Sequence, residues 1–142
     1  MLPIPTLPAE EAVKIMNSLG GKGIPFIFVI DFEGKNTMIE TLPLADTNPI
    51  QYSIKGETSN HSPVLTPQRS FRFDVTPPKK EDYIKKFRQI MDHIQYGNTY
   101  LINLTQPSQV DTDLSLEDIF RMSRAPYKLL VKDHFTVFSP EL

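Results

Sequence analysis

The chain has 142 residues, of which 39% are hydrophobic and 23% are charged, and its 15 basic side chains are balanced by 17 acidic ones. A chain of this length and composition is expected to be soluble and to bury about two-thirds of its unfolded surface. It contains no cysteine, which excludes a disulfide scaffold, a thiolate metal site and a cysteine nucleophile.

Neither charge nor hydropathy points to nucleic acid or to a membrane. A formal net charge of -2 provides no basic surface of the kind that a phosphate backbone requires. No apolar run approaches the roughly 20 residues that span a bilayer, and residues 1–5 lack the features of an export signal. We therefore expect no nucleic-acid partner, no membrane and a cytoplasmic location.

The chain is expected to open with a helix followed by a hairpin. An apolar stripe predicts the helix over residues 8–19. The apolar run 24–30 has no polar alternation, which predicts a strand covered on both faces, and residues 37–42 can pair back with it. Asp31 at the end of this strand either orders the following turn or acts as a functional carboxylate, and the turn is favoured.

The next segment is expected to run over the surface before it returns to the core. Residues 43–67 are polar and rich in proline, which predicts a surface connection with a short strand-like piece at 50–54. Residues 70–75 alternate between apolar and polar side chains. That period predicts a half-buried strand.

The strongest helix signal lies in the second half of the chain. Four apolar side chains recur there at helical spacing, and Gly97 follows where a left-handed residue ends a helix, which predicts a helix over residues 79–96. Such a stripe marks either a partner groove or a face turned to the protein interior, and the interior is favoured. The stripe consists of Tyr83, Phe87, Ile90 and Ile94.

Strands dominate the remainder of the chain. Residues 98–107 are aromatic and β-branched, which predicts a strand, and Asn103 within it needs hydrogen-bond partners in the interior or a polar cavity. A third helix is predicted to begin near Ser115. Residues 127–132 and 135–138 then predict two strands around a turn.

No catalytic constellation is visible from the residues alone. The histidines at positions 61, 93 and 134 are too scattered to suggest a metal site. The chain has no serine nucleophile elbow and no phosphate loop. The residues by themselves therefore predict an α/β (α+β) fold, with mostly antiparallel sheet and helices packed on it, and leave the chemistry open.

Four stretches stand out in order along the chain: the helix stripe, Gly97-Asn98-Thr99-Tyr100-Leu101-Ile102-Asn103-Leu104-Thr105, Ala125-Pro126-Tyr127, and Ser139-Pro140-Glu141. Together they resemble the chorismate-binding enzymes, a family that includes anthranilate synthase, isochorismate synthase and the large subunit of aminodeoxychorismate synthase. The resemblance is closest to short aminodeoxychorismate synthase component I proteins, also called the para-aminobenzoate synthase large subunit. It covers residues 80–142 continuously and the first 76 residues more loosely.

The resemblance implies that the chain is the N-terminal part of an anthranilate synthase component I-like sandwich. Residues 1–76 would be a strand-rich segment, and residues 77–142 the start of the chorismate-binding domain, truncated after the Ser-Pro-Glu motif. The intact enzyme would convert chorismate and glutamine-derived ammonia to 4-amino-4-deoxychorismate for p-aminobenzoate and folate synthesis. It would use Mg²⁺ and a glutamine amidotransferase subunit as partner.

Two sites follow from the same resemblance. Glu141 is expected to be a general acid or base near the departing C4 hydroxyl of chorismate. Pro126 and Tyr127 resemble one wall of a pocket that binds tryptophan in larger relatives, and are expected to form a regulatory or structural pocket. A serine-containing motif that forms another part of that pocket is not found in residues 1–76. The family's Mg²⁺ ligands follow the Ser-Pro-Glu motif, so this chain alone is expected to bind no cofactor and to be inactive.

Two alternatives stay open. The chain can belong to an anthranilate or isochorismate synthase, or it can be a non-catalytic binding or interaction module that is complete at 142 residues. A complete module predicts a satisfied sheet edge after Phe138. A fragment predicts an exposed apolar face or edge there, and self-association to cover it.

Overall fold

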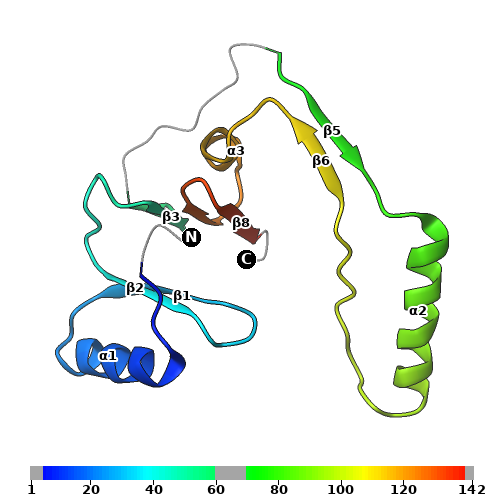
Figure 1. The fold of residues 1–142 in the computed structure, drawn as a ribbon, viewed down its shortest axis with the longest axis horizontal. Coiled ribbons are helices and arrows are strands. Elements are labelled where there is room, and N and C mark those ends of the chain that lie inside the picture. The colour runs from blue at the N-terminus through cyan, green and yellow to red at the C-terminus, as the bar shows by residue number, and fades with distance from the viewer. Residues whose placement is uncertain (1–4, 60–69, 140–142) are drawn as a thin grey trace. The chain divides into compact units, whose positions relative to one another are not determined.

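The computed structural model describes residues 5–59 and 70–139 (Figure 1), so Glu141 lies outside the described residues. The described residues form two compact units: unit 1 consists of residues 5–59 and 115–139, and unit 2 of residues 70–114. Unit 2 is thus inserted in the sequence of unit 1. The division into domains at residues 76 and 77 stays a prediction.

Unit 1 begins with a helix and a hairpin, as predicted. Helix α1 (Ala9–Gly21) is followed by β1 (Phe26–Ile30), which pairs antiparallel with β2 (Thr37–Thr41). Asp31 orders the turn between the strands: its carboxylate accepts hydrogen bonds from Lys35 N at 2.8 Å and from Asn36 Nδ2 at 2.7 Å. The Asn36 hydrogen bond is the main cause that holds the pKa of the Asp31 carboxyl below its usual 3.8. The turn role of Asp31 is therefore confirmed.

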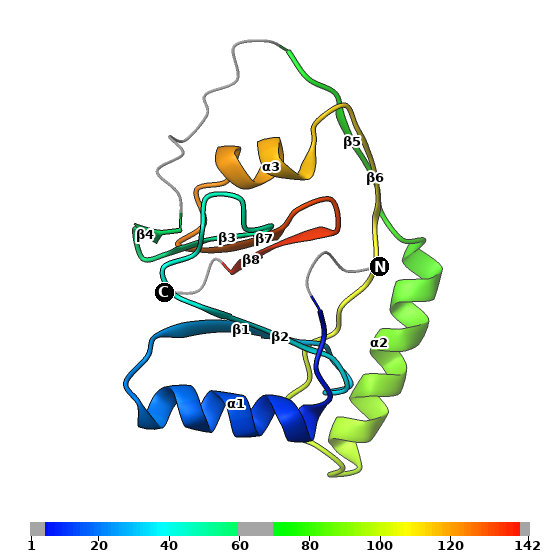
Figure 2. The same cartoon turned by 60° about the vertical axis from the view of Figure 1, so that its left-hand side comes forward.

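Four strands from both ends of the sequence form the larger sheet of unit 1. Its order is β4 (Glu57–Thr58), β3 (Ile50–Ile54), β7 (Tyr127–Val131), β8 (Phe135–Ser139), and all pairs are antiparallel. Figure 2 shows helix α3 (Leu116–Met122) on one side of this sheet and the β1–β2 hairpin on the other, with α1 beyond the hairpin. The mixed fold with antiparallel sheets is confirmed.

The core of unit 1 fills the space between the hairpin and the larger sheet. Its buried members are Met38, Leu44, Ile50 and Val131, against which Ile27 and Val29 of β1 pack. The other face of β1 is open, because Phe28 is 51% and Ile30 46% exposed. The prediction that this strand is covered on both faces is wrong, because α1 packs mainly against the neighbouring strand β2.

A lysine of the sheet forms hydrogen bonds with the C-terminal end of helix α3. Ser115 and Asp118 form a capping box at the start of the helix. At the other end, Lys128 Nζ donates to Phe120 O at 2.8 Å and to Ser123 O at 3.0 Å, and lies 4.7 Å from the Phe120 ring centroid. Positive charge is favourable at a helix C-terminus. Burial nevertheless lowers the pKa of Lys128.

Replacing this lysine by an apolar side chain of similar length is expected to destabilise unit 1. Lys128→Met removes both donors to the helix carbonyls, which should lower the free energy of unfolding by about 1 kcal/mol. Urea unfolding followed by circular dichroism measures the change. Lys132→Met is the matched control, because Lys132 is exposed and its Nζ lies 3.8 Å from Glu117 Oε1. An equal loss in both variants would contradict the anchoring role of Lys128.

Unit 2 consists of a two-stranded ribbon and one long helix. Strand β5 (Phe73–Thr76) pairs antiparallel with β6 (Gln109–Thr112), and helix α2 (Lys80–Gln95) ends before Gly97, whose φ is 85°. The helix and its end agree with the prediction. Strand β6 was not predicted.

Two expectations about unit 2 are wrong. The strand at 70–75 is not half-buried, because every residue of β5 is exposed. Residues 98–107 contain no strand, and Asn103 is exposed rather than in an interior or a polar cavity. The α2 stripe is not covered within the described part of its unit, since no residue of α2 is buried, and its place in the interior of the protein stays a prediction. The common reason is that the described part of unit 2 has no second layer against which these side chains could pack.

Candidate functional site

The larger sheet presents one face as three rows of side chains across β3, β7 and β8. Directly paired residues of neighbouring strands share a face, as do residues two apart on one strand. The strand register therefore places the rows Ile50–Val131–Phe135, Tyr52–Leu129–Val137 and Ile54–Tyr127–Ser139 next to one another. This regular array forms the floor of the candidate site.

Coverage of that face decreases from one end of the strands to the other. In the first row Ile50 is 1% and Val131 0% exposed, because both belong to the core under the β1–β2 hairpin. In the other rows Val137 is 51% and Ile54 44% exposed. The hairpin thus covers one end of the sheet and leaves the other end open.

A cavity of about 250 Å³ lies at this open end. Its floor is formed by the second and third rows, and β1 supplies its wall through Ile27 and Phe28. The lining residues are mainly apolar and aromatic, and three of them, Tyr52, Tyr127 and Ser139, carry a hydroxyl group. A concave apolar site with a few polar groups is the usual form of a small-molecule site.

Two lysines lie close to residues that line the cavity, and their ammonium groups are held in different places. Lys128 contributes to the lining, yet its ammonium group is held at Phe120 O by helix α3, on the opposite side of the sheet. Lys55 Nζ lies 5.8 Å from the centroid of the Tyr127 ring, which is a cation–π arrangement. Lys55 is therefore the cation next to the open end.

The lining of this cavity is mainly apolar and aromatic. Among the described residues that line the cavity there is no carboxylate and no histidine. Such a lining suits an aromatic or apolar ligand.

The two residues predicted for the pocket, Pro126 and Tyr127, have different places in the structure. Tyr127 lines the cavity at the middle of the third row. Pro126 acts through its backbone, because its carbonyl accepts a hydrogen bond from Lys55 N at 2.9 Å. Glu141 lies outside the described residues, so its role stays a prediction. The sequence reasoning missed Tyr52 and Ile54, although their spacing from Ile50 by two and four residues already indicated one strand face.

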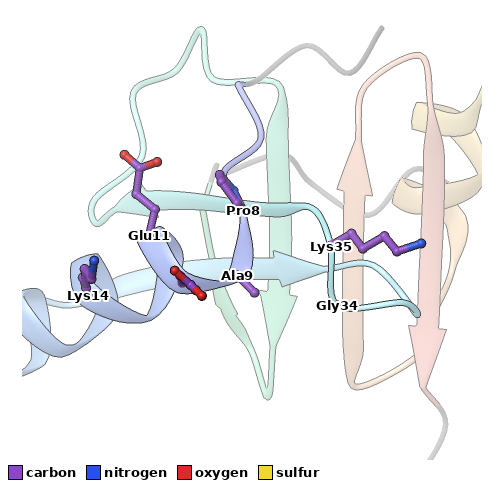
Figure 3. Close-up of a pocket in the computed structure, with 7 residues that line it drawn as sticks. Pro8, Ala9, Glu11, Lys14, Gly34 and Lys35 are labelled. Atoms are coloured by element: carbon purple, nitrogen blue, oxygen red, sulfur yellow. The ribbon is translucent and has the colours of Figure 1, made fainter.

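A second depression, of about 760 Å³, lies between the first turn of α1 and the β1–β2 turn (Figure 3). A helix N-terminus attracts anions, but Glu10 and Glu11 occupy the first turn of α1 and oppose an anion. Lys35 is directed away from that turn in Figure 3 and pairs with Glu33 at 2.7 Å. This depression therefore lacks the charge pattern of an anion-binding site.

The described residues offer no metal site and no membrane span. Residues 5–59 and 70–139 contain no group of three His, Asp or Glu side chains that could hold a metal ion. None of the helices in the same ranges is long and apolar enough to cross a membrane.

Comparison with known proteins relates this fold to a family of enzymes. Residues 27–142 match the family described as chorismate binding enzyme. The chain is 35% identical over 129 residues to an uncharacterized PabA-like protein of Pasteurella multocida (strain Pm70), with 91% of this chain and 40% of the relative covered. It is 37% identical over 133 residues to an uncharacterized PabA-like protein of Haemophilus influenzae (strain ATCC 51907 / DSM 11121 / KW20 / Rd), with 93% and 40% covered. No solved structure matches significantly.

The chain belongs to the chorismate-binding enzyme family, because the family match takes in most of its length. It spans about 40% of the length of these two relatives. The matched range includes the hairpin, the larger sheet and the whole of unit 2. Both units are therefore parts of the family's structure.

Proposed function

We propose that this chain is the N-terminal part of an enzyme that converts chorismate and glutamine-derived ammonia to 4-amino-4-deoxychorismate. The observation that carries the proposal is the family match over residues 27–142, which includes the ordered motifs between Tyr83 and Glu141. The names of the two relatives, PabA-like proteins, favour the p-aminobenzoate and folate route over anthranilate or isochorismate synthesis.

In this proposal most of the catalytic groups come from outside the described residues. Glu141 would exchange a proton with the C4 hydroxyl as it leaves the ring, a role that needs a carboxylate beside the substrate. Mg²⁺ would neutralise the chorismate carboxylates in the intact enzyme. The described residues have no group that fits this ion, so no step of the reaction is derived through it here. A cytoplasmic location and a glutamine amidotransferase partner belong to the same proposal.

Product analysis tests the proposal directly. A polypeptide that carries this chain together with the rest of the family domain is incubated with chorismate, ammonia and Mg²⁺. Chromatography should detect 4-amino-4-deoxychorismate, whereas the 142-residue chain alone should give no turnover. Anthranilate or isochorismate as the product would replace the proposed reaction by that of a sibling enzyme. Turnover by the chain alone would contradict the proposed division of the catalytic groups.

The cavity at the open end of the sheet is proposed to be a regulatory or structural pocket for tryptophan, the ligand that the family resemblance implies. Tyr127→Ala removes an aromatic ring from the middle of the cavity floor and is expected to weaken tryptophan binding about tenfold or more. Isothermal titration calorimetry measures the affinity. Tyr100→Ala is the matched control, because Tyr100 is 93% exposed and lies in unit 2. No tryptophan binding by the unmodified chain would sink this assignment.

A further inference from the structure

The last row of side chains at the open end of the larger sheet joins three strands. Ile54 of β3 is paired with Tyr127 of β7, and Tyr127 is paired with Ser139 of β8. Within the described residues, β8 lies at the edge of the sheet and its hydrogen-bonded neighbour is β7. The place where β8 ends is therefore set from the β7 side, by the residue opposite Ser139.

Tyr127 itself has a well-defined position. Its ring lies 5.8 Å from the Nζ atom of Lys55, whose backbone N–H donates to Pro126 O at 2.9 Å. Directly opposite residues of an antiparallel pair have Cβ atoms about 4.5–5.5 Å apart, so their side chains interact. Both Tyr127 and Ser139 also line the same cavity. The tyrosine ring is thus held from the β3 side and supports Ser139 on the other.

Backbone donors become scarce directly beyond this pair. In the antiparallel register, the residue before Tyr127 is Pro126 and the residue after Ser139 is Pro140. Proline has no N–H to donate. The pair of Tyr127 and Ser139 is therefore the last one at this end of β7 and β8 in which both residues carry a backbone donor.

Glu141 follows this pair at a short distance along the chain. It comes two residues after Ser139, and two residues span at most about 7 Å. Proline fixes its own φ and restricts the residue before it, which leaves a link through Pro140 fewer free torsions than two other residues would have. The position of Ser139 therefore limits where the Glu141 carboxylate can lie.

We propose that Tyr127 is a positioning residue for Glu141. By supporting Ser139 it sets the point at which the chain leaves the sheet, and with it the distance between the Glu141 carboxylate and the C4 hydroxyl of chorismate. The inference rests on the proposed role of Glu141 as the group that exchanges a proton with that hydroxyl. A misplacement of about 1 Å can cost a factor of about 10² in rate, so Tyr127 acts on the reaction without contact with the substrate.

A double-mutant cycle tests the inference in the polypeptide that carries this chain with the rest of the family domain. In assays of chorismate turnover without tryptophan, Tyr127→Ala should lower kcat about 10-fold to 100-fold and change KM less than about twofold. Tyr127→Phe keeps the ring and should retain the activity. In a Glu141→Gln background, Tyr127→Ala should cost less than about twofold, because a residue that acts through the carboxylate has no further effect once the carboxylate is gone.

A milder variant keeps the test valid if Tyr127→Ala does not fold, which circular dichroism checks. Ile54→Ala removes the paired neighbour on the other side of Tyr127, where the isoleucine is 44% exposed. It should give a smaller loss of kcat that also disappears in the Glu141→Gln background.

The outcomes separate the inference from the proposed reaction. An unchanged kcat in Tyr127→Ala, or a loss of the same size with and without the Glu141 carboxylate, would overturn the positioning role and leave the reaction intact. An unchanged rate in Glu141→Gln would remove the role of Glu141 and the inference together. A different product from chorismate, with the cycle as expected, would replace only the proposed reaction.

Discussion

Leu130→Ala is expected to lower the free energy of unfolding of unit 1 by about 2–5 kcal/mol, through lost burial and the cavity left behind. Leu130 is 0% exposed and lies on β7, the strand between β3 and β8. It shares a sheet face with Lys128, whose ammonium group lies over the Phe120 ring of α3. The leucine is therefore enclosed between the sheet and that helix, where little relaxation can fill a void.

Urea unfolding monitored by circular dichroism measures this effect. Val137→Ala is the control within the same sheet, because Val137 on β8 is 51% exposed and its truncation removes little buried surface. The control is expected to lose less than about 1 kcal/mol. Equal losses in the two variants would mean that the layer between α3 and the sheet is not packed as described.

Glu141→Gln is expected to reduce kcat by about 10²–10⁴ in the polypeptide that carries the rest of the family domain, with little change in chorismate KM. The reason is that the amide keeps the size of the side chain but cannot transfer a proton to or from the C4 hydroxyl, and general acid–base catalysis contributes a factor of this size. This prediction rests on the family resemblance of the Ser139-Pro140-Glu141 motif.

Steady-state kinetics across pH checks the role of Glu141. The variant should lose one limb of the pH dependence of kcat, which a merely structural residue would not remove. Glu10→Gln is the matched control, because Glu10 lies in the exposed first turn of α1. A Glu141→Gln enzyme with an unchanged rate and pH profile would remove this residue from the mechanism.

Elements with a strong local signal were predictable from the sequence. Helix α2 has an apolar stripe at helical period and ends before Gly97, and both features act within a few residues of the chain. The β7–β8 hairpin was predictable for the same reason, since two strand-like runs flank Asp133 and His134, and aspartate is common in turns. In the structure Asp133 has a positive φ of 60°. Asp31 was expected to order its turn through its own neighbours, and it does so.

The errors occur where the outcome depends on a distant partner. Residues 98–107 have the composition of a strand, but the described part of unit 2 provides no neighbouring strand to pair with them, and Leu101 is 88% exposed. The sequence predicted that β1 is buried on both faces, but in the structure only one of its faces is covered. The amino-acid composition of a segment shows only that its residues tend to be buried or paired. Whether they are buried depends on another part of the structure that packs over them.

The sequence by itself determined the local elements, the turn at Asp31 and the resemblance to the chorismate-binding enzymes, because each depends on residues close together in the chain or on motifs in order. Only the tertiary structure decided that Tyr52 and Ile54 lie beside Tyr127, since the register of β3 against β7 joins segments more than 70 residues apart. It also decided that a hairpin covers one end of that sheet and leaves a cavity at the other. Such coverage is set by long-range packing, which no local period encodes.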